Sequence, residues 1–242
     1  MDDFEKDQVL QWYEWFEDEL LAILKYIPPA DQNLQTFSPR IATLIVESCG
    51  LLDSIFRQTS PDPATIGGKN KPRRKLDICD YAELYTTQLQ LPTARSILLI
   101  ATPKYLTPFS AWKELLSGGD YKAAPWWRIH TDLKHDRIAN LKAARLEVAI
   151  ESLCALHLII ATLPEFASAV LKNSWVFNPR YNPKDVIEIL EGTATAPHSF
   201  LVESKLFVVA RGFEKFPASI NDFHPAMFNA SDRLNNIFRR WW

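Results

Sequence analysis

Apolar residues recur every three or four positions along three long stretches of the chain, the spacing of one face of an α-helix. The predicted helices cover residues 4–27, 38–59 and 140–163. Pro28 and Pro29 end the first, because proline lacks the amide hydrogen that a helix interior needs. Ser38 as N-cap and Pro39 at the first helical position favour the start of the second. Asn140 is expected to cap the third.

Shorter patterns predict further elements. Asp77 is expected to cap a helix over about residues 78–89, and Pro125 to begin one over residues 125–137. The apolar run at residues 96–101 favours a strand, although so short a run also suits a helix. Residues 199–210 resemble a small β-hairpin, and residues 233–242 a terminal helix. We therefore expect a mainly α protein, with a helical bundle over residues 1–165 and a small α+β extension over residues 166–242.

Composition narrows the function classes. Only 7 of the 242 residues are glycine, which favours long helices over a many-stranded sandwich. The formal net charge is −2, so contact with a nucleic acid has to be local. Cys49, Cys79 and Cys154 are far apart and form no Cys-x-x-Cys motif, which indicates reduced thiols rather than disulfides or zinc ligands. We expect no metal and no cofactor.

The N-terminus is acidic and lacks the basic start and apolar run of a signal peptide. The longest apolar stretch, residues 153–163, is interrupted by His157 and is too short to cross a bilayer. We expect a soluble, cytoplasmic protein that has no membrane partner.

The segment with the clearest chemistry is residues 125–137, Pro-Trp-Trp-Arg-Ile-His-Thr-Asp-Leu-Lys-His-Asp-Arg. On a helix, Arg128 and His135 are seven residues apart and differ by only about 20° in direction. Thr131 and Asp132 fall between them on the same face, whereas Trp126 and Leu133 lie roughly opposite and can enter the core.

An arginine–histidine pair suits cleavage of RNA without a metal ion. Histidine titrates near neutrality and can move the proton of a 2′-hydroxyl or of a leaving group. Arginine stays cationic and presents a planar fork to phosphate oxygens. In this hypothesis His135 transfers the proton, Arg128 stabilises the phosphate charge, and Thr131 and Asp132 orient them. Because the pair spans two helical turns, it is expected to work best with a second copy facing it across a dimer cleft.

The chain also resembles the HEPN family of bacterial proteins over about residues 5–165. The similar stretches are Trp126-Trp127, Lys134-His135-Asp136-Arg137 with Asn140-Leu141, Asn33-Leu34 with Ser38-Pro39-Arg40-Ile41, the helix that contains Glu47, and residues 77–91. The resemblance implies an antiparallel helical bundle that forms homodimers. Many members are metal-independent ribonucleases of toxin–antitoxin and phage-defence systems, with arginine and histidine separated by four to six residues. Arg128 and His135 fit the long form of that signature.

Other cations are candidates for binding RNA phosphate, or else belong to a solvated surface. They are Lys134 and Arg137 beside the pair, and Arg73, Arg74 and Lys75 in a basic loop that begins at Lys69. His130 and His157 are expected to be hydrogen-bonded residues of the bundle. The tail, residues 238–242, is expected to anchor on the body or on a partner, or to stack on bases.

Two functional hypotheses remain. In the first, a homodimer binds or cleaves RNA, as a toxin or antiviral effector with an antitoxin or defence-system partner. In the second, the chain is a catalytically silent HEPN-like interaction module that dimerises or docks a partner through its aromatic surfaces. The alternative to catalysis for the pair itself is a structural role, in which Arg128 pairs with Asp132 and His135 is a hydrogen-bonded interface residue. The acidic net charge favours the second, as does Ile129, since active members usually have a polar residue directly after the arginine.

Overall fold

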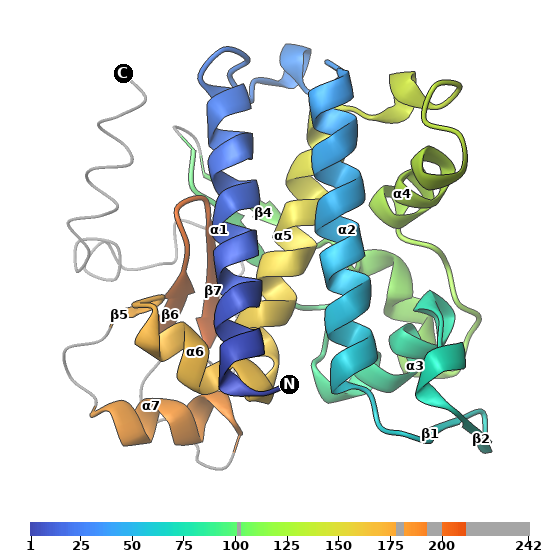
Figure 1. Ribbon diagram of the computed structural model, residues 1–242, viewed down its shortest axis with the longest axis vertical. Helices are drawn as coiled ribbons and strands as arrows, with labels where there is room; N and C mark the ends of the chain where they lie inside the picture. The colour runs from blue at the N-terminus through green and yellow to red at the C-terminus, as the bar shows by residue number, and fades with distance from the viewer. Residues whose placement is uncertain (101–102, 178–181, 193–199, 212–242) are drawn as a thin grey trace. The chain divides into compact units, whose positions relative to one another are not determined.

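Helices make up most of the regular structure, as predicted, in the computed structural model of the protein (Figure 1). The structure describes residues 1–100, 103–177, 182–192 and 200–211. The α-helices are α1 (Asp3–Leu24), α2 (Pro39–Thr59), α3 (Ile78–Gln88), α4 (Pro125–His135), α5 (Leu146–Thr162), α6 (Ala167–Lys172) and α7 (Pro183–Leu190). Short 3-10 helices are η1 (Asp31–Asn33), η2 (Arg73–Lys75), η3 (Ser110–Ser117), η4 (Leu141–Ala143) and η5 (Pro164–Phe166).

The local start signals act as the sequence indicates. The Ser38 hydroxyl accepts a hydrogen bond from the Ile41 amide at 3.2 Å, and Pro39 is the first residue of α2. Asp77 accepts hydrogen bonds from the amides of Cys79 and Asp80 at the start of α3. Both predicted caps are therefore confirmed.

The chain divides into two compact units, each assembled from separate stretches. The first contains Pro29–Ala94 and Thr107–Leu156, together with Met1, and the second contains Asp2–Pro28, Arg95–Leu106 and the chain from His157 onward. The expected boundary near residue 165 does not coincide with this division. Helix α1, which we expected in the N-terminal bundle, belongs with the C-terminal part of the chain, and the division falls within α5.

In the first unit, α2 and the first part of α5 lie side by side. The Leu146 amide donates to the Thr36 carbonyl at 2.8 Å, which places the start of α5 beside the start of α2. Further along, the Ser48 hydroxyl donates to the Ser152 hydroxyl at 3.2 Å, and both side chains are buried. The two helices therefore run in the same direction, so the expected antiparallel arrangement does not hold for this pair.

The first unit also contains a two-stranded hairpin, whose second strand includes the start of the expected basic loop. Strands β1 (Ala64–Ile66) and β2 (Lys69–Lys71) pair antiparallel. Gly67 and Gly68 form the turn with positive φ angles of 52° and 76°, which glycine adopts without a steric penalty. The Gly67 amide donates to the Glu83 carboxylate at 2.7 Å and ties the turn to α3.

The second unit contains a five-stranded antiparallel sheet in the order β4-β3-β7-β6-β5. Its strands are β3 (Ser96–Leu98), β4 (Lys104–Leu106), β5 (Val176–Phe177), β6 (Phe200–Glu203) and β7 (Phe207–Arg211). The expected strand near residue 96 and the expected hairpin near residue 200 are confirmed. What the sequence did not indicate is that they share one sheet, in which Ile97 pairs with Val208. The terminal helix expected over residues 233–242 lies outside the described residues.

Within the described ranges, no single helix has both the length and the apolar composition to cross a membrane. Helix α5 and the following residues Pro164–Lys172 meet that test together, by length and composition only, and they are bent by 78°.

Candidate functional site

Helix α4 carries the predicted catalytic residues and is held in the first unit by aromatic side chains. Trp126 is fully buried, and its indole Nε1 donates to the Pro108 carbonyl at 2.7 Å. Leu133, two turns further along the same face, is also buried, as predicted. Phe109 packs edge-on against Trp126 with ring centroids 5.6 Å apart. These contacts fix which side of α4 faces outward.

The outward face presents Arg128, Asp132 and His135, all exposed. Among the residues that the structure describes, none of these three side chains makes a hydrogen bond or an ion pair. The pairing of Arg128 with Asp132, which a structural role for Arg128 predicts, is therefore not formed. Three polar groups on one helix face are left open to a ligand or a partner.

Thr131 differs from its neighbours on this face. Its side chain is half-buried, and its hydroxyl donates to the Trp127 carbonyl one turn earlier at 3.1 Å. The hydroxyl proton is thus used within the helix, and the oxygen keeps lone pairs with which to accept a hydrogen bond.

The separation of Arg128 and His135 limits what one chain can do. Seven residues of α-helix correspond to a rise of about 10 Å, which is longer than a phosphate group. The two side chains of one chain therefore suit two neighbouring phosphates better than a single one.

Helix α4 ends at His135 rather than at Arg137, because Asn140 closes its C-terminal end. The Asn140 side-chain amide donates to the carbonyls of Asp132 and Asp136 at 3.1 and 2.8 Å. The prediction that Asn140 caps the long helix is wrong, since α5 begins only at Leu146. The reason is that the exposed carbonyls at the end of α4 are nearer in the chain and compete for the same side chain.

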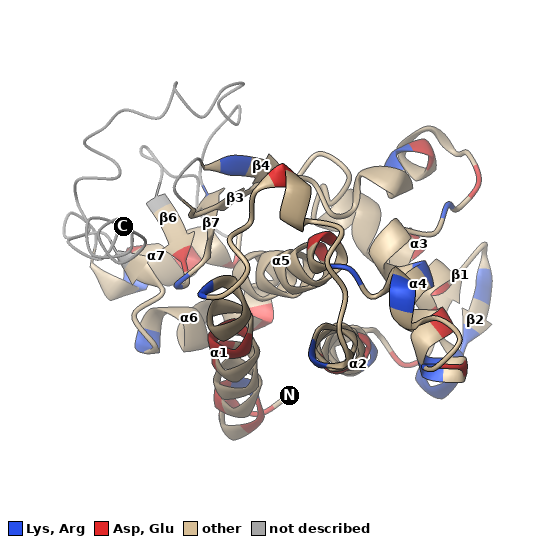
Figure 2. Cartoon of the chain, turned by 90° about the horizontal axis from the view of Figure 1, so that it is seen from above, with Lys and Arg blue, Asp and Glu red and all other residues tan. Residues whose placement is uncertain are grey.

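The cations predicted to bind RNA are exposed to different degrees. Lys134 and Arg137 are exposed, in the last turn of α4 and in the loop after it, where basic and acidic residues alternate (Figure 2). Arg74 and Lys75 are exposed as well. Arg73 is half-buried, and its guanidinium Nε is buried without a hydrogen-bond partner among the described atoms.

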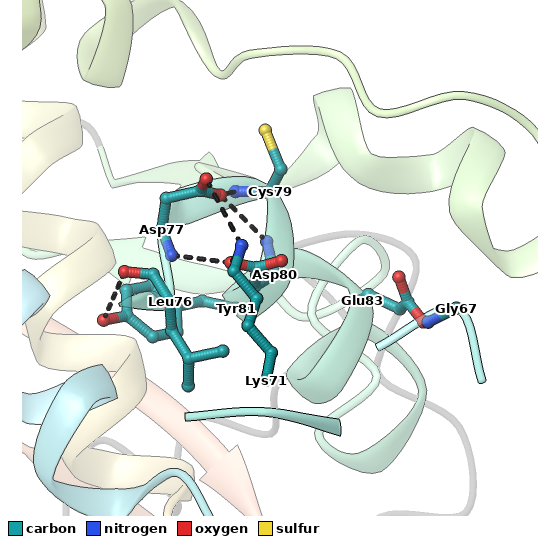
Figure 3. Close-up of polar contacts among 8 residues, drawn as sticks. All are labelled: Gly67, Lys71, Leu76, Asp77, Cys79, Asp80, Tyr81 and Glu83. Carbon is teal, nitrogen blue, oxygen red and sulfur yellow. Dashed lines mark hydrogen bonds and ion pairs between the residues drawn. The ribbon is translucent and has the colours of Figure 1, made fainter. Parts of the chain in front are cut away.

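The basic loop also contains a cation that is already neutralised. Lys71 bonds to the carboxylate of Asp80 and lies 3.7 Å from that of Asp77 (Figure 3). The hydrogen bond to Asp80 raises the pKa of Lys71 and outweighs the opposing effect of desolvation. Lys71 therefore fastens β2 to the start of α3 and adds little to an RNA-binding surface.

The structure does not bring the two predicted cationic groups together. Arg145, in the loop between α4 and α5, forms an isolated backbone β-bridge with Phe37, which lies just before the start of α2. The basic loop follows the other end of α2. Helix α2 has 21 residues and so spans about 30 Å (Figure 1). His135 lies toward one end of this helix and residues Arg73–Lys75 toward the other.

The two internal histidines are buried, as expected, but they lack hydrogen bonds that we expected them to make. His130 Nδ1 and both ring nitrogens of His157 lack a partner among the described residues. Burial lowers the pKa of His130 to about 4 and that of His157 to about 3. The apolar positions that these side chains occupy were predictable, but the absence of partners was not.

A buried polar cluster in the second unit escaped the sequence analysis. The Glu17 carboxylate on α1 has no exposed surface and accepts hydrogen bonds from four groups, which we call the Glu17 cluster. The donors are Tyr13 Oη (3.0 Å), Ser204 Oγ (2.5 Å), Lys205 N (3.1 Å) and Leu206 N (2.7 Å). Burial raises the pKa of Glu17, and the hydrogen bonds oppose that rise. The cluster binds α1 to the turn between β6 and β7, a structural task.

No group of three or more His, Cys, Asp or Glu side chains among the described residues is placed to hold a metal ion. Comparisons with protein-family models, with curated proteins and with solved structures give no match to this chain.

Proposed function

We propose that this protein is a HEPN-like ribonuclease that binds RNA on the outward face of α4 and cleaves it without a metal ion. The observation that supports the proposal is the exposure of Arg128, Asp132 and His135 on one face, with no partner in the described part of the chain. Charged groups that make no internal hydrogen bond or ion pair are available to bind phosphate and to transfer protons. A toxin or phage-defence role, with its antitoxin or defence-system partner, is part of the same proposal.

In this mechanism the 2′-oxygen of a ribose attacks the adjacent phosphorus and the 5′-oxygen of the next nucleotide leaves. His135 accepts the 2′-hydroxyl proton, and the leaving 5′-oxygen takes its proton from water. Arg128 donates hydrogen bonds to the phosphorane oxygens as their negative charge develops. Thr131 and Asp132 orient these groups. The products are a 2′,3′-cyclic phosphate and a free 5′-hydroxyl.

A homodimer overcomes the distance between the two residues within one chain. If two copies of α4 face each other in opposite directions about a twofold axis, His135 of each copy comes toward Arg128 of the other. One phosphate then contacts an arginine and a histidine from different chains. This geometry requires the open α4 face to lie at the dimer interface.

The test is cleavage of total tRNA and of a mixed single-stranded RNA pool in EDTA, with products resolved by gel and their ends identified. We expect the wild-type protein to leave cyclic-phosphate ends. His135→Ala and Arg128→Ala are expected to lose at least about 100-fold in rate, the usual effect of removing a general acid–base or charge-stabilising group. Lys142→Ala, an exposed cation in η4, is the matched control and should keep the rate.

Activity that disappears in EDTA, or activity that survives in both variants, would contradict the mechanism. Absence of cleavage by folded wild-type protein would instead favour the second candidate, a catalytically silent interaction module. One observation specifically favours that candidate: Ile138, in the loop three residues after the end of α4, is 92% exposed. In that case Ile138→Ser should weaken self-association measured by light scattering, while His135→Ala should not.

A further inference from the structure

Helix α1 in the second unit exposes large aromatic side chains along one side. The exposed fractions are 72% for Phe4, 53% for Trp12, 59% for Trp15 and 85% for Tyr26, and we call these four residues the aromatic stripe. Phe4 and Trp15 are eleven residues apart, close to three helical turns, so they point in nearly the same direction, and Tyr26 follows in the turn just after α1. Trp12 lies one turn before Trp15 at the edge of the stripe.

The other side of α1 is a conventional buried face. Leu10, Tyr13 and Leu20 are almost completely buried. The aromatic stripe is therefore not needed to hold α1 in the second unit. An aromatic surface of this length that stays in water costs solvation free energy, and contiguous exposed apolar patches mark interaction sites.

The charge around the stripe indicates what kind of ligand it accepts. Helix α1 contains seven carboxylates and one lysine. Glu17 is one of the seven and is buried. Asp3 and Asp18 have side chains that are 88% and 57% exposed, and they pair with Lys6 and Lys205. A second copy of α1 placed on the stripe would bring carboxylates against carboxylates, which is unfavourable. A cationic segment with its own aromatic residues suits both features, because arginine is attracted to carboxylates and to the face of tryptophan.

We propose that residues 233–242 of this same chain bind the aromatic stripe of α1. Their sequence is Arg-Leu-Asn-Asn-Ile-Phe-Arg-Arg-Trp-Trp, with three arginines, no carboxylate side chain and three aromatic rings. These residues lie outside the described part of the structure. Thirty-one residues follow Arg211, the last residue of β7, which belongs to the same unit as α1. An extended segment of that length reaches up to roughly 100 Å, far more than the length of α1.

The arginines supply the charge complementarity and the rings supply the contact area. Arg239 and Arg240 match the carboxylates beside the stripe, and their guanidinium planes can stack on Trp12 or Trp15. Trp241 and Trp242 can pack against the remaining rings in edge-on or offset geometry. This interaction is independent of the function proposed for α4.

Site-specific photo-crosslinking tests the proposal in the full chain. p-Benzoylphenylalanine replaces Trp15, and crosslinked peptides are identified by mass spectrometry after irradiation of the monomer-sized and dimer-sized fractions. We expect crosslinks from position 15 to residues 233–242 within one chain. The same photoreactive residue at Phe37, an aromatic position of the first unit that is 43% exposed, is the matched control and should not give these crosslinks.

Charge variants of residues 233–242 test whether the arginines are needed for the crosslink. Arg239→Glu with Arg240→Glu should lower the crosslink yield by roughly fivefold for each arginine lost, the effect of an exposed cation–π contact. Arg239→Lys with Arg240→Lys keeps the charge and should retain most of the yield. Circular dichroism must show the same helix content and melting temperature in all variants.

Three outcomes would overturn the proposal. They are crosslinks from position 15 only to position 15 of a second copy, crosslinks to residues 233–242 found only in the dimer-sized fraction, and a yield that does not respond to the reversal of the two charges. The first outcome would identify a second copy of α1 as the occupant, and the second the segment of a second chain.

Discussion

The outward face of α4 in the first unit and the Glu17 cluster in the second unit both consist of polar groups, but the first is exposed and the second is buried. On α4, Arg128 and His135 are exposed and have no partner among the described residues. On α1, Glu17 is completely buried and accepts four hydrogen bonds. The buried carboxylate of Glu17 holds α1 to the turn between β6 and β7, whereas the exposed and unpaired side chains of α4 remain available to a ligand.

The comparison has a thermodynamic basis. A buried carboxylate loses several kcal/mol of hydration free energy, which only good hydrogen bonds offset. Removing either the carboxylate or its hydrogen-bond donors should therefore lower the free energy of unfolding strongly. An exposed arginine or histidine keeps its hydration and contributes little to folding. The stability of the protein should therefore depend strongly on Glu17 and hardly at all on the α4 face, while the proposed activity should show the reverse.

The largest effect is expected for Glu17→Gln. The amide keeps the shape of the side chain, but its NH2 group then faces groups that already donate hydrogen bonds. We expect the free energy of unfolding to fall by about 2–4 kcal/mol, measured by urea denaturation. Asp18→Asn is the matched control, since its partner Lys205 Nζ is half-exposed, and it should change the stability by less than about 1 kcal/mol. Equal effects of the two variants would contradict a structural role for the Glu17 cluster.

A smaller, pH-dependent effect is expected at His157, which packs on Trp175 with ring centroids 5.4 Å apart. Its pKa is about 3 in the folded state and about 6.5 when unfolded, so between these values only the unfolded chain takes up the proton. Stability is thus fully present above pH 6.5 and is lost as the pH falls toward 3. We expect His157→Phe to remove about 2 kcal/mol of the loss between pH 7 and pH 5.

The measurement is the difference between wild type and His157→Phe in urea denaturation at each pH. Burial raises the pKa of Glu17, which acts in the opposite direction, and taking the difference between the two proteins removes that contribution. His135→Gln controls for the loss of an exposed imidazole. A wild-type pH dependence that persists unchanged in His157→Phe would show that other groups cause it.

The smallest effect on stability is expected for Arg128→Ala and His135→Ala. Because both side chains are exposed and make no hydrogen bond or ion pair with another described residue, each change should alter the free energy of unfolding by less than about 0.5 kcal/mol. Thermal melts of both variants at pH 7 check this directly. A loss above 1 kcal/mol in either variant would mean that the α4 face supports the fold, and the contrast with Glu17 would then fail.

Where a structural signal is local, the sequence was sufficient to predict the element. Ser38 and Pro39 start α2, and Asp77 caps α3, because each acts on backbone groups within the next few residues. The same holds for the burial of Trp126 and Leu133 opposite the face of Arg128, which follows from helical periodicity alone. The residues of the candidate site on α4 were placed on one face for this reason.

Where two nearby groups compete for one side chain, the sequence prediction failed. Asn140 precedes a helical pattern and looks like its N-cap, but its amide binds the end of α4 instead. The pairing of Lys71 with Asp80 likewise depends on how the β1–β2 hairpin is folded against α3, so five neighbouring cations in the sequence do not form one continuous basic surface.

Local patterns along the chain were enough to predict the mainly helical class, the starts of α2, α3 and α4, the hairpin of β6 and β7, and the common face of Arg128 and His135. Only the tertiary structure decided that β3 pairs with β7, that α1 groups with the C-terminal part of the chain, and that Glu17 lies at the turn that follows β6. The physical reason is range. Helix periods and caps act over a few residues, whereas sheet partners and buried hydrogen bonds join groups such as Glu17 and Leu206, whose proximity no local pattern encodes.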